Sequence, residues 1–416
     1  MSELSNGKQQ NRNVLISGAS AAGLSLAYWL SRYGFNPTVV ERAPALRAGG
    51  YAIDLRGAAV HVAERMGILT AARQASTDLR EILFVGSNHE TLASMDANFG
   101  AGSGEAGDVE ILRDDLAQIL YAASKDTVEY IFRDSITSLT QHDQGVDVTF
   151  ERGAARTFDL VVGADGAHSN VRDLVFGEES QFSHYLGQHV AIFTVPNYLN
   201  LDRVWLMHYV PKKMAAIMQY GSCKHTRALI MFSAPKLIYN HRDVAQQKKI
   251  VATIFAEEKD WEFPRLMEEM REASDFYFDD ISQIRMDHWS SGRVALVGDA
   301  AYGPTLITGQ GTSMALVGAC VLAGELAAAA GDYRYAYARY EQACCSYMKQ
   351  NQEIALKAKE MQLPQTWDEI AEQNKQLRAM RAAPSGSPPE DSIGDLIQKA
   401  ANSIKLKSYQ PLLLKK

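Results

Sequence analysis

The chain has 416 residues, of which 46% are hydrophobic and 22% charged, and its formal net charge is −7. This length leaves room for two or three domains and a large core, the composition excludes wholesale disorder, and the negative charge argues against a general nucleic-acid binder. Four cysteines without a CxxC pair exclude a disulfide scaffold and a zinc ribbon, and favour free thiols in a reducing cytoplasm.

The first predicted unit begins after a polar N-terminal stretch, residues 1–13, that lacks the apolar segment of a secretory signal. An apolar run at 14–17 predicts a buried strand, residues 21–33 a helix, and residues 37–40 a second strand that closes with Glu41. Strand, turn, helix, strand and acid is the order of a dinucleotide-binding βαβ unit. We expect no export and a cytoplasmic protein.

The turn of this unit contains Gly18, Ser20 and Gly23, a G-x-S-x-x-G variant of the usual three-glycine pattern. Gly18 permits a tight turn, Gly23 allows close packing of helix and strand, and the Ser20 hydroxyl can reach a phosphate. The helix N-terminus then faces a pyrophosphate, and Glu41 accepts hydrogen bonds from a ribose diol. This unit alone does not distinguish NAD(P) from FAD.

Two later acid-glycine turns follow predicted strands. Three short strands within residues 130–163 lead into Asp165-Gly166, and an apolar strand ends in Gly298-Asp299. Next come Gly309, Gly311 and Thr312, which open a helix through residue 330 whose apolar character favours burial in a core over a membrane span. The strand ends place carboxylates at the edge of a sheet where ligands bind.

The segment between these turns, about 184–275, has a different character. Four strands are predicted at 190–195, 204–210, 215–220 and 226–233, rich in methionine and aromatic residues. These side chains are either ordinary sheet core or the wall of an aromatic-sized pocket, and alternation along each strand leaves open which face lines it.

The C-terminal part is helical. Thr366 and Glu369 form a capping box, residues 384–390 are typical of a linker, and Ser392 can cap a last helix with one apolar face. That helix either covers core or bridges domains near a substrate opening. No H-E-x-x-H or His/Cys cluster is present among the ten histidines, so we expect no metal centre; we interpret His168 as a surface or phosphate-side residue, and Cys344-Cys345 as packing.

In order and separation, the three motifs resemble those of the FAD-dependent group A aromatic hydroxylases, typified by para-hydroxybenzoate hydroxylase, over about residues 12–345. The resemblance implies an α/β fold in which a Rossmann-like FAD-binding domain carries an inserted β-sheet substrate domain and a C-terminal bridging helix. It implies that Gly18, Gly23, Glu41 and Arg42 hold the adenosine half of FAD. Arg113 looks like the arginine that supports the pyrophosphate.

The same resemblance assigns Asp165 and Gly166 to the second motif, which serves both FAD and NADPH. Asp299, Gly309 and Gly311 form the third motif, beside the ribityl chain and the flavin ring.

A closer resemblance is to the tetracycline-inactivating flavin monooxygenases, the tetracycline destructases. It rests on R-A-G-G at 47–50 with I-D-L-R-G at 53–57, on residues 195–202, and on G-D-A-A-Y at 298–302 followed by G-Q-G-T-S at 309–313. It adds Arg47 and Asp54 to the cofactor-binding residues. Where the family usually has a proline seven residues after the third-motif aspartate, this chain has Leu306, which puts the substrate range in doubt more than cofactor binding.

These resemblances divide the chain into an FAD-binding domain at 12–183 and 276–345, a substrate-binding domain at 184–275, a helical extension at 346–383, a linker at 384–391 and a C-terminal helix at 392–416. The candidate substrate-contacting residues are Phe193, Met207, Met218, Tyr220, Met231, Leu306 and Ile307.

The implied activity is a monooxygenase that consumes NADPH, or NADH, and O₂ and oxygenates a polycyclic phenolic or enolic substrate through a flavin hydroperoxide, plausibly inactivating tetracyclines. This chemistry belongs to the cofactor and needs no protein nucleophile, only position and a dry pocket. We expect a monomer with no nucleic-acid or membrane partner. The alternatives are a hydroxylase of another aromatic or polyketide, and a non-catalytic flavin- or ligand-binding protein.

Overall fold

The computed structural model describes residues 11–46, 51–96, 107–221, 225–357, 363–381, 393–409 and 412. Its first layer is a six-stranded sheet in the order β17-β18-β11-β1-β2-β7. All neighbours are parallel except β17 and β18, so this is a mostly parallel sheet of the kind expected of a dinucleotide-binding unit. The strands are β1 (Asn13–Ser17), β2 (Asn36–Glu41), β7 (Glu129–Phe132), β11 (Leu160–Gly163), β17 (Ser290–Ser291) and β18 (Val294–Leu296).

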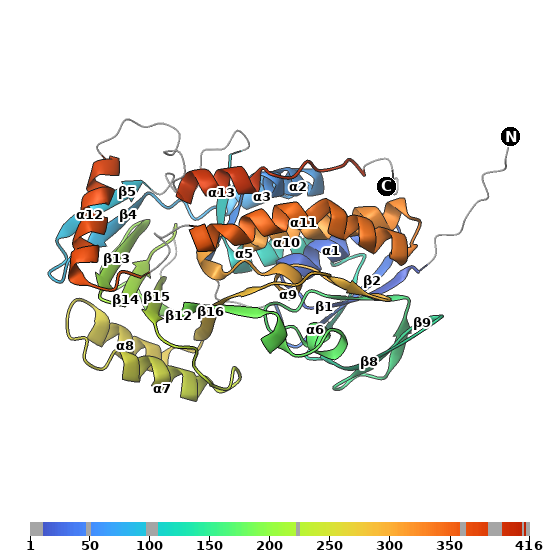
Figure 1. The fold of residues 1–416 in the computed structure, drawn as a ribbon, viewed down its shortest axis with the longest axis horizontal. Coiled ribbons are helices and arrows are strands. Elements are labelled where there is room, and N and C mark those ends of the chain that lie inside the picture. The colour runs from blue at the N-terminus through green and yellow to red at the C-terminus, as the bar shows by residue number, and fades with distance from the viewer. Residues whose placement is uncertain are drawn as a thin grey trace.

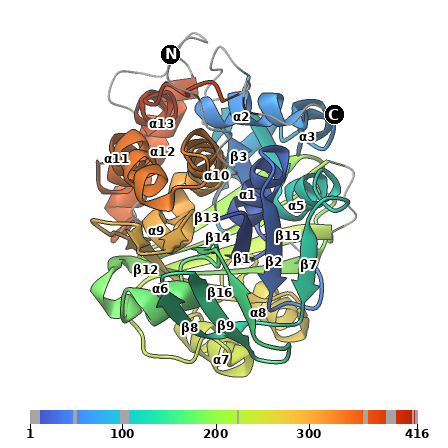
Figure 2. The same cartoon turned by 90° about the vertical axis from the view of Figure 1, so that its right-hand side faces the viewer.

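Helices cover one face of this sheet. The buried helix α10 (Gly311–Ala328) packs between α1 (Ala21–Arg32) and α11 (Tyr333–Lys357), as Figures 1 and 2 show. Helix α10 alone among the helices of the described residues is long and apolar enough to cross a membrane, but 78% of it is buried in the protein, as the core interpretation predicts. The same layer contains α2 (Ala58–Met66), α3 (Leu69–Gln74), α5 (Arg113–Ala122) and α9 (Asp299–Tyr302).

The opposite side carries a small antiparallel sheet of β8 (Ile136–His142), β9 (Gly145–Phe150) and β10 (Arg156–Phe158), with α6 (Asn170–Val175) beside it. The predicted meander is therefore present, but the stretch of its third predicted strand is divided: β10 pairs with β9 in the small sheet, whereas β11 pairs with β1 in the main sheet. Two further strands, β3 (Ala52–Leu55) and β6 (Val109–Leu112), form an antiparallel pair.

A seven-stranded, mostly antiparallel sheet forms the second layer, in the order β16-β12-β15-β14-β13-β4-β5. One face packs on α7 (Val244–Ile254) and α8 (Phe263–Glu272), which lie beneath it in Figure 1. The strands are β4 (Glu81–Val85), β5 (Thr91–Asp96), β12 (Ser183–Pro196), β13 (Val204–Val210), β14 (Lys213–Met218), β15 (His225–Ser233) and β16 (Tyr277–Ile284).

This sheet is wider than the predicted substrate domain, because β4, β5 and β16 lie outside residues 184–275. Helix α11 also runs unbroken through the predicted division between 345 and 346. Strands far apart in the sequence can pair in one sheet, so a division drawn along the chain did not include β4, β5 and β16 with the other strands. The domain limits stay a prediction.

Two C-terminal helices lie on different parts of the molecule (Figure 1). Helix α12 (Trp367–Arg381) packs against β5 and β13, and its first turn is capped as predicted, since the Glu369 amide donates to the Thr366 hydroxyl over 3.2 Å. Helix α13 (Ile393–Ala401) instead covers α11, with Ile397 packed on Ile354. The C-terminal segment thus spans both layers. The linker at 384–390 and Ser392 lie outside the described residues.

Candidate functional site

The turn between β1 and α1 requires both of its glycines. Gly18 has a φ of +106°, its N–H donates to the Val40 carbonyl over 2.8 Å, and a Cβ there would lie 2.6 Å from the Ala164 carbonyl oxygen. A Cβ on Gly23 would lie 1.9 Å from the Gly18 carbonyl oxygen. Both distances are too short for any side chain, so the turn brings the start of α1 directly against the strand ends.

The start of α1 is prepared for an anion. Ser20 occupies the N-cap position, but its hydroxyl accepts a hydrogen bond from Arg113 Nη2 over 3.2 Å rather than from the helix backbone. The amides of the first helical turn and the positive end of the helix dipole therefore face the same place as a guanidinium. This combination suits a pyrophosphate.

Glu41 lies at the end of β2, next to this turn. Its Oε2 accepts from the Ala19 amide and its Oε1 from the Ala43 amide, each over 2.8 Å. A carboxylate has about four acceptor positions, so capacity remains for the two hydroxyls of a ribose. Arg42, the next residue, is exposed at the rim.

Arg113, at the start of α5, is surrounded by groups of complementary charge. Burial alone would lower its pKa, but Tyr51, Tyr277, Asp299 and Glu41 together raise it. The guanidinium therefore stays charged and lies between the first and third motifs, as expected of a residue that supports a diphosphate.

The second motif uses its acid mainly to hold its own turn. Asp165 accepts hydrogen bonds from the hydroxyls of Ser17 at 3.3 Å and Ser169 at 2.5 Å, and from the Val171 amide at 3.2 Å. Burial raises its pKa, which these hydrogen bonds oppose. Gly166 follows with a φ of +88° and open space around it. The acid therefore shapes the turn, and the Gly166 backbone is the part left accessible.

The third motif places Asp299 in a recess. The residue is reached by solvent, but many protein atoms surround its carboxylate. This desolvation raises the pKa of Asp299, and the charge of Arg113 opposes the rise. A Cβ on Gly311 would lie 3.5 Å from Asp299 Oδ1, so the turn that opens α10 lies directly beside this carboxylate. Thr312, the next residue of α10, is half-buried.

The loop between α9 and α10 has a strained backbone and buried polar atoms without hydrogen-bond partners among the residues that the structure describes. Thr305 has a φ of +91° and a ψ of 149°, a region that β-branched residues rarely adopt. Gln310 is fully buried, and within the described part of the chain neither atom of its amide group has a hydrogen-bond partner. Buried polar atoms are normally satisfied, so this loop is shaped to receive a group from outside the chain.

Strand β3 is held against this loop by a hydrogen bond and a close contact. Asp54 and Arg56 form an ion pair of 3.0 Å, and the Ser313 hydroxyl donates to the Asp54 carbonyl over 2.9 Å. A Cβ on Gly309 would lie 2.9 Å from Asp54 Oδ2. The structure therefore brings Asp54, a predicted cofactor-binding residue, beside Gly309 of the third motif. Arg47 lies outside the described residues.

Most of the predicted substrate residues share one apolar cluster. It lies on the face of the seven-stranded sheet opposite α7 and α8 and includes Met207, Met218, Tyr220, Met231, Leu306 and Ile307. Phe193 is the exception: it is fully buried on the other face, against α7 and α8. Alternation along β12 places it there, so it does not join the other predicted substrate residues.

The cluster is bordered by residues that sequence reasoning missed. Tyr51 and Tyr277 pack against it, with ring centroids 6.5 Å apart. Glu110, on β6, accepts a hydrogen bond from the Thr77 hydroxyl, and burial followed by Asp54 raises its pKa to about 7. The V-E-I-L pattern of β6, an acid in an otherwise apolar strand, was the only signal in the sequence for it.

The residues present fit FAD. The α1 turn and Glu41 suit its ADP half, Arg113 its diphosphate, and Asp299 with the under-bonded 305–310 loop its ribityl chain and flavin ring. The apolar cluster lies beside that loop, because Leu306 and Ile307 of the loop pack against it.

Comparison with known proteins agrees with this geometry. Residues 11–351 match the family described as FAD binding domain. The chain belongs to this FAD-binding family. A flavin-dependent monooxygenase of Legionella longbeachae is 37% identical over 402 residues, which is 96% of this chain and 99% of that protein. An uncharacterized Mycobacterium tuberculosis protein is 48% identical over 342 residues, 82% of this chain and 92% of its own length.

The fold also matches over nearly the whole chain. The crystal structure of tetracycline destructase Tet(51) superposes with a TM-score of 0.81 at 33% identity, covering 95% of this chain and 99% of that one. Family membership and relatives together make this protein an FAD-dependent monooxygenase with the predicted fold.

Proposed function

We propose that this monooxygenase consumes NADPH, or NADH, and O₂ to oxygenate a polycyclic phenolic or enolic compound, and that tetracyclines are its substrates. The observation that carries the proposal is the apolar cluster beside the 305–309 loop, whose methionines and tyrosines form an adaptable wall of the kind that flat, ring-containing ligands need. The full-length likeness to a tetracycline destructase supports the choice of substrate.

The work of the chain's own residues is binding and exclusion of water. FAD, when bound, supplies the reaction of reduced flavin with O₂. The first-motif amides, Glu41 and Arg113 hold it in place, and the third-motif turn directs backbone amides toward a ring that gains charge on reduction. Met218, Met231 and their neighbours would exclude water from the substrate side of bound FAD.

Leu306 distinguishes this pocket from that of the resembled family, in which a proline is usual at this position. Leu306 packs against the apolar cluster and follows the strained Thr305. A leucine is larger and more mobile than a proline, so we propose that it narrows the space beside the flavin and selects among polycyclic substrates.

The decisive experiment is an NADPH-consumption screen of the FAD-loaded protein with several tetracyclines and simple phenols, coupled to the mass of each product. We expect substrate-dependent NADPH oxidation and a product heavier by one oxygen atom. NADPH oxidation with other aromatics but not tetracyclines would make it a hydroxylase of a different substrate. Stoichiometric drug binding with no product from any substrate would contradict turnover altogether.

We also propose that the protein works as a monomer in the cytoplasm, with the domain division given above. Size-exclusion chromatography with light scattering at assay concentration tests the first statement, and a dimer mass would contradict it. Leu306→Pro tests the role of this position: we expect the ranking of substrates by kcat/KM to change while FAD content does not.

A further inference from the structure

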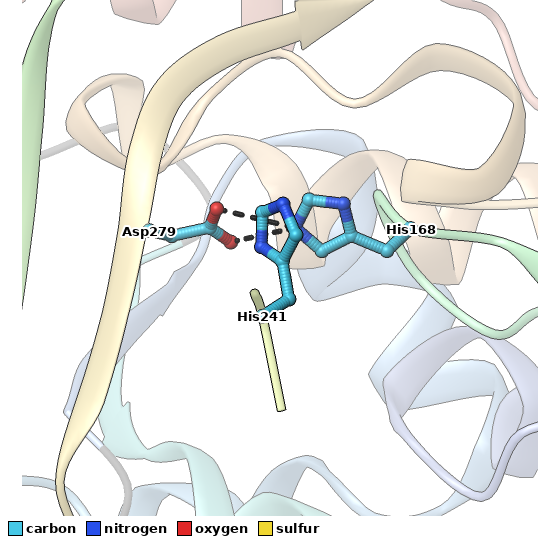
Figure 3. A group of neighbouring side chains, drawn as sticks. All are labelled: His168, His241 and Asp279. Atoms are coloured by element: carbon cyan, nitrogen blue, oxygen red, sulfur yellow. Dashed lines mark hydrogen bonds and ion pairs between the residues drawn. The ribbon is translucent and has the colours of Figure 1, made fainter. Parts of the chain in front are cut away.

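A cluster of metal-ligating side chains lies apart from the flavin-side loop, where three segments meet. His168 comes from the turn after β11, His241 from the loop before α7, and Asp279 from β16 of the seven-stranded sheet. Figure 3 shows both imidazole rings turned toward the Asp279 carboxylate. Sequence reasoning expected no metal centre because no H-E-x-x-H motif or His/Cys cluster is present, and these three residues are far apart in the chain.

The distances in this cluster are close to those of a coordination sphere. His168 Nε2 lies 3.1 and 3.2 Å from the two Asp279 oxygens, and the two imidazole rings have centroids 4.1 Å apart. One donor atom from each of the three residues lies within 4.8 Å of the others. Ligands at about 2.1 Å from a tetrahedral zinc are roughly 3.4 Å apart, so only small side-chain movements separate this arrangement from a bound ion.

Two of the three ligands, His168 and Asp279, are also oriented by a second partner, as in established zinc sites. His168 Nδ1 lies 3.0 Å from Glu179, which Arg172 also binds over 3.0 Å, and the Tyr277 hydroxyl donates to Asp279 over 2.9 Å. A histidine that binds zinc usually donates its other N–H to a carboxylate in this way, which directs the lone pair of the first nitrogen to the metal.

A proton is the competing occupant. Burial opposes the charge on His168, but its hydrogen bonds to Asp279 and Glu179 raise its pKa to about 10. That ion pair, however, leaves His241 without a role: within the described residues neither of its ring nitrogens has a hydrogen-bond partner, although the ring faces the same carboxylate. A cation bound by all three side chains uses every donor present.

We propose that His168, His241 and Asp279 bind one zinc ion, with water as the fourth ligand. Two imidazoles and one carboxylate are ligands typical of zinc, whereas magnesium and calcium prefer oxygen alone. The ion fastens the Asp165–Ser169 turn of the FAD-binding sheet to the seven-stranded sheet, so its role is structural. The proposal does not depend on which substrate the enzyme oxidises.

The test is zinc binding by the untagged, FAD-loaded protein after dialysis against a chelator. Competition with a chromophoric chelator should show one equivalent of zinc bound, and cobalt should give the visible absorption of a tetrahedral site. His241→Ala leaves the His168 ion pair intact, and we expect it to weaken zinc binding by at least about tenfold. Asp279→Asn should do the same, with retained FAD absorbance as the check on folding.

The matched control is His288→Ala, which removes another exposed histidine that lies 3.3 Å from a carboxylate, that of Glu341. This variant should bind zinc like the unaltered protein. Absence of stoichiometric binding at micromolar zinc, or binding unchanged by His241→Ala, would overturn the proposal and leave the cluster as a proton-bridged ion pair. Neither result depends on NADPH turnover, so the proposed function is tested separately.

Discussion

On the flavin side of the molecule, Gly18, Gly23 and Glu41 are dictated by the backbone: a Cβ on either glycine would overlap a carbonyl oxygen, and both Glu41 oxygens accept amides of the turn. On the substrate side, the seven-stranded sheet is apolar on both faces, and Met231 or Phe193 could be replaced by other apolar residues without breaking a hydrogen bond. The difference teaches that cofactor binding depends on a backbone geometry that few residues can adopt, whereas substrate choice depends on the volume of the apolar side chains.

The largest effect should follow a change that breaks the geometry. Gly23→Val places side-chain atoms where a Cβ alone would be 1.9 Å from the Gly18 carbonyl oxygen. Because backbone on both sides must move, we expect the free energy of unfolding to fall by more than about 4 kcal/mol, with loss of bound FAD. Chemical denaturation and the flavin spectrum measure both.

Gly67→Ala is the matched control for this glycine. Gly67 ends α2 with a φ of +76° and has no described atom within 4 Å of its Cβ position. Strain alone then costs about 1 kcal/mol, and FAD should be retained. Equal damage from the two variants would mean that the close approach at Gly23 is not what destabilises the protein.

This contrast also explains what could be predicted from the sequence. The βαβ unit, its glycines, and the acids Glu41 and Asp299 were found because each backbone conformation admits few residue types. The face of β12 that carries Phe193 was not, since six consecutive buried residues on this strand hide the alternation. The His168, His241 and Asp279 cluster was invisible because only folding brings its segments together.

Glu41→Ala is the second prediction, and it tests the cofactor contact without a steric clash. It removes the acceptor of two amides and of the ribose, so we expect FAD affinity to fall by about tenfold to a hundredfold. Fluorescence of released flavin measures the dissociation constant. The control is Glu129→Ala. Glu129 is an exposed acid on the neighbouring strand β7 and pairs with Arg156, so FAD affinity should stay unchanged. A similar loss of affinity would show a general effect of charge.

The two faces of the sheet can be compared directly. Met231→Ala removes side-chain volume from the apolar cluster, and we expect KM for the substrate to rise about tenfold with FAD content unchanged. Phe193→Ala creates a cavity against α7 and α8, which should cost about 3 to 5 kcal/mol of stability while the folded enzyme keeps its KM. A raised KM for both variants would contradict the assignment of faces.

A smaller effect is expected at Thr305, where the two regions meet. Its φ of +91° is a conformation that glycine adopts without penalty, so Thr305→Gly should raise Tm by about 2 °C with FAD retained. Thr308→Gly, in the same loop, should lower Tm, because the Thr308 hydroxyl donates to the Thr305 carbonyl over 3.0 Å. A lower Tm for Thr305→Gly would show that its contacts outweigh the strain.

An effect of similar size tests Glu110, which interacts electrostatically with Asp54 and with buried Tyr220. Burial and Asp54 raise its pKa from 4.5 to about 7, so between these values the unfolded chain releases a proton that the folded protein keeps. Wild-type stability from this group is therefore complete below pH 4.5 and lost as pH rises through about 7.

Glu110→Gln keeps an acceptor for Thr77 but cannot ionise, so its Tm advantage should grow by a few degrees from about pH 5 to pH 8. Asp108, whose pKa burial raises to about 6, is present in both proteins, and its titration largely cancels in the difference. A Tm difference that stays flat across this range would place the Glu110 carboxyl in contact with water, and the junction of the two regions would then be more open than the structure describes.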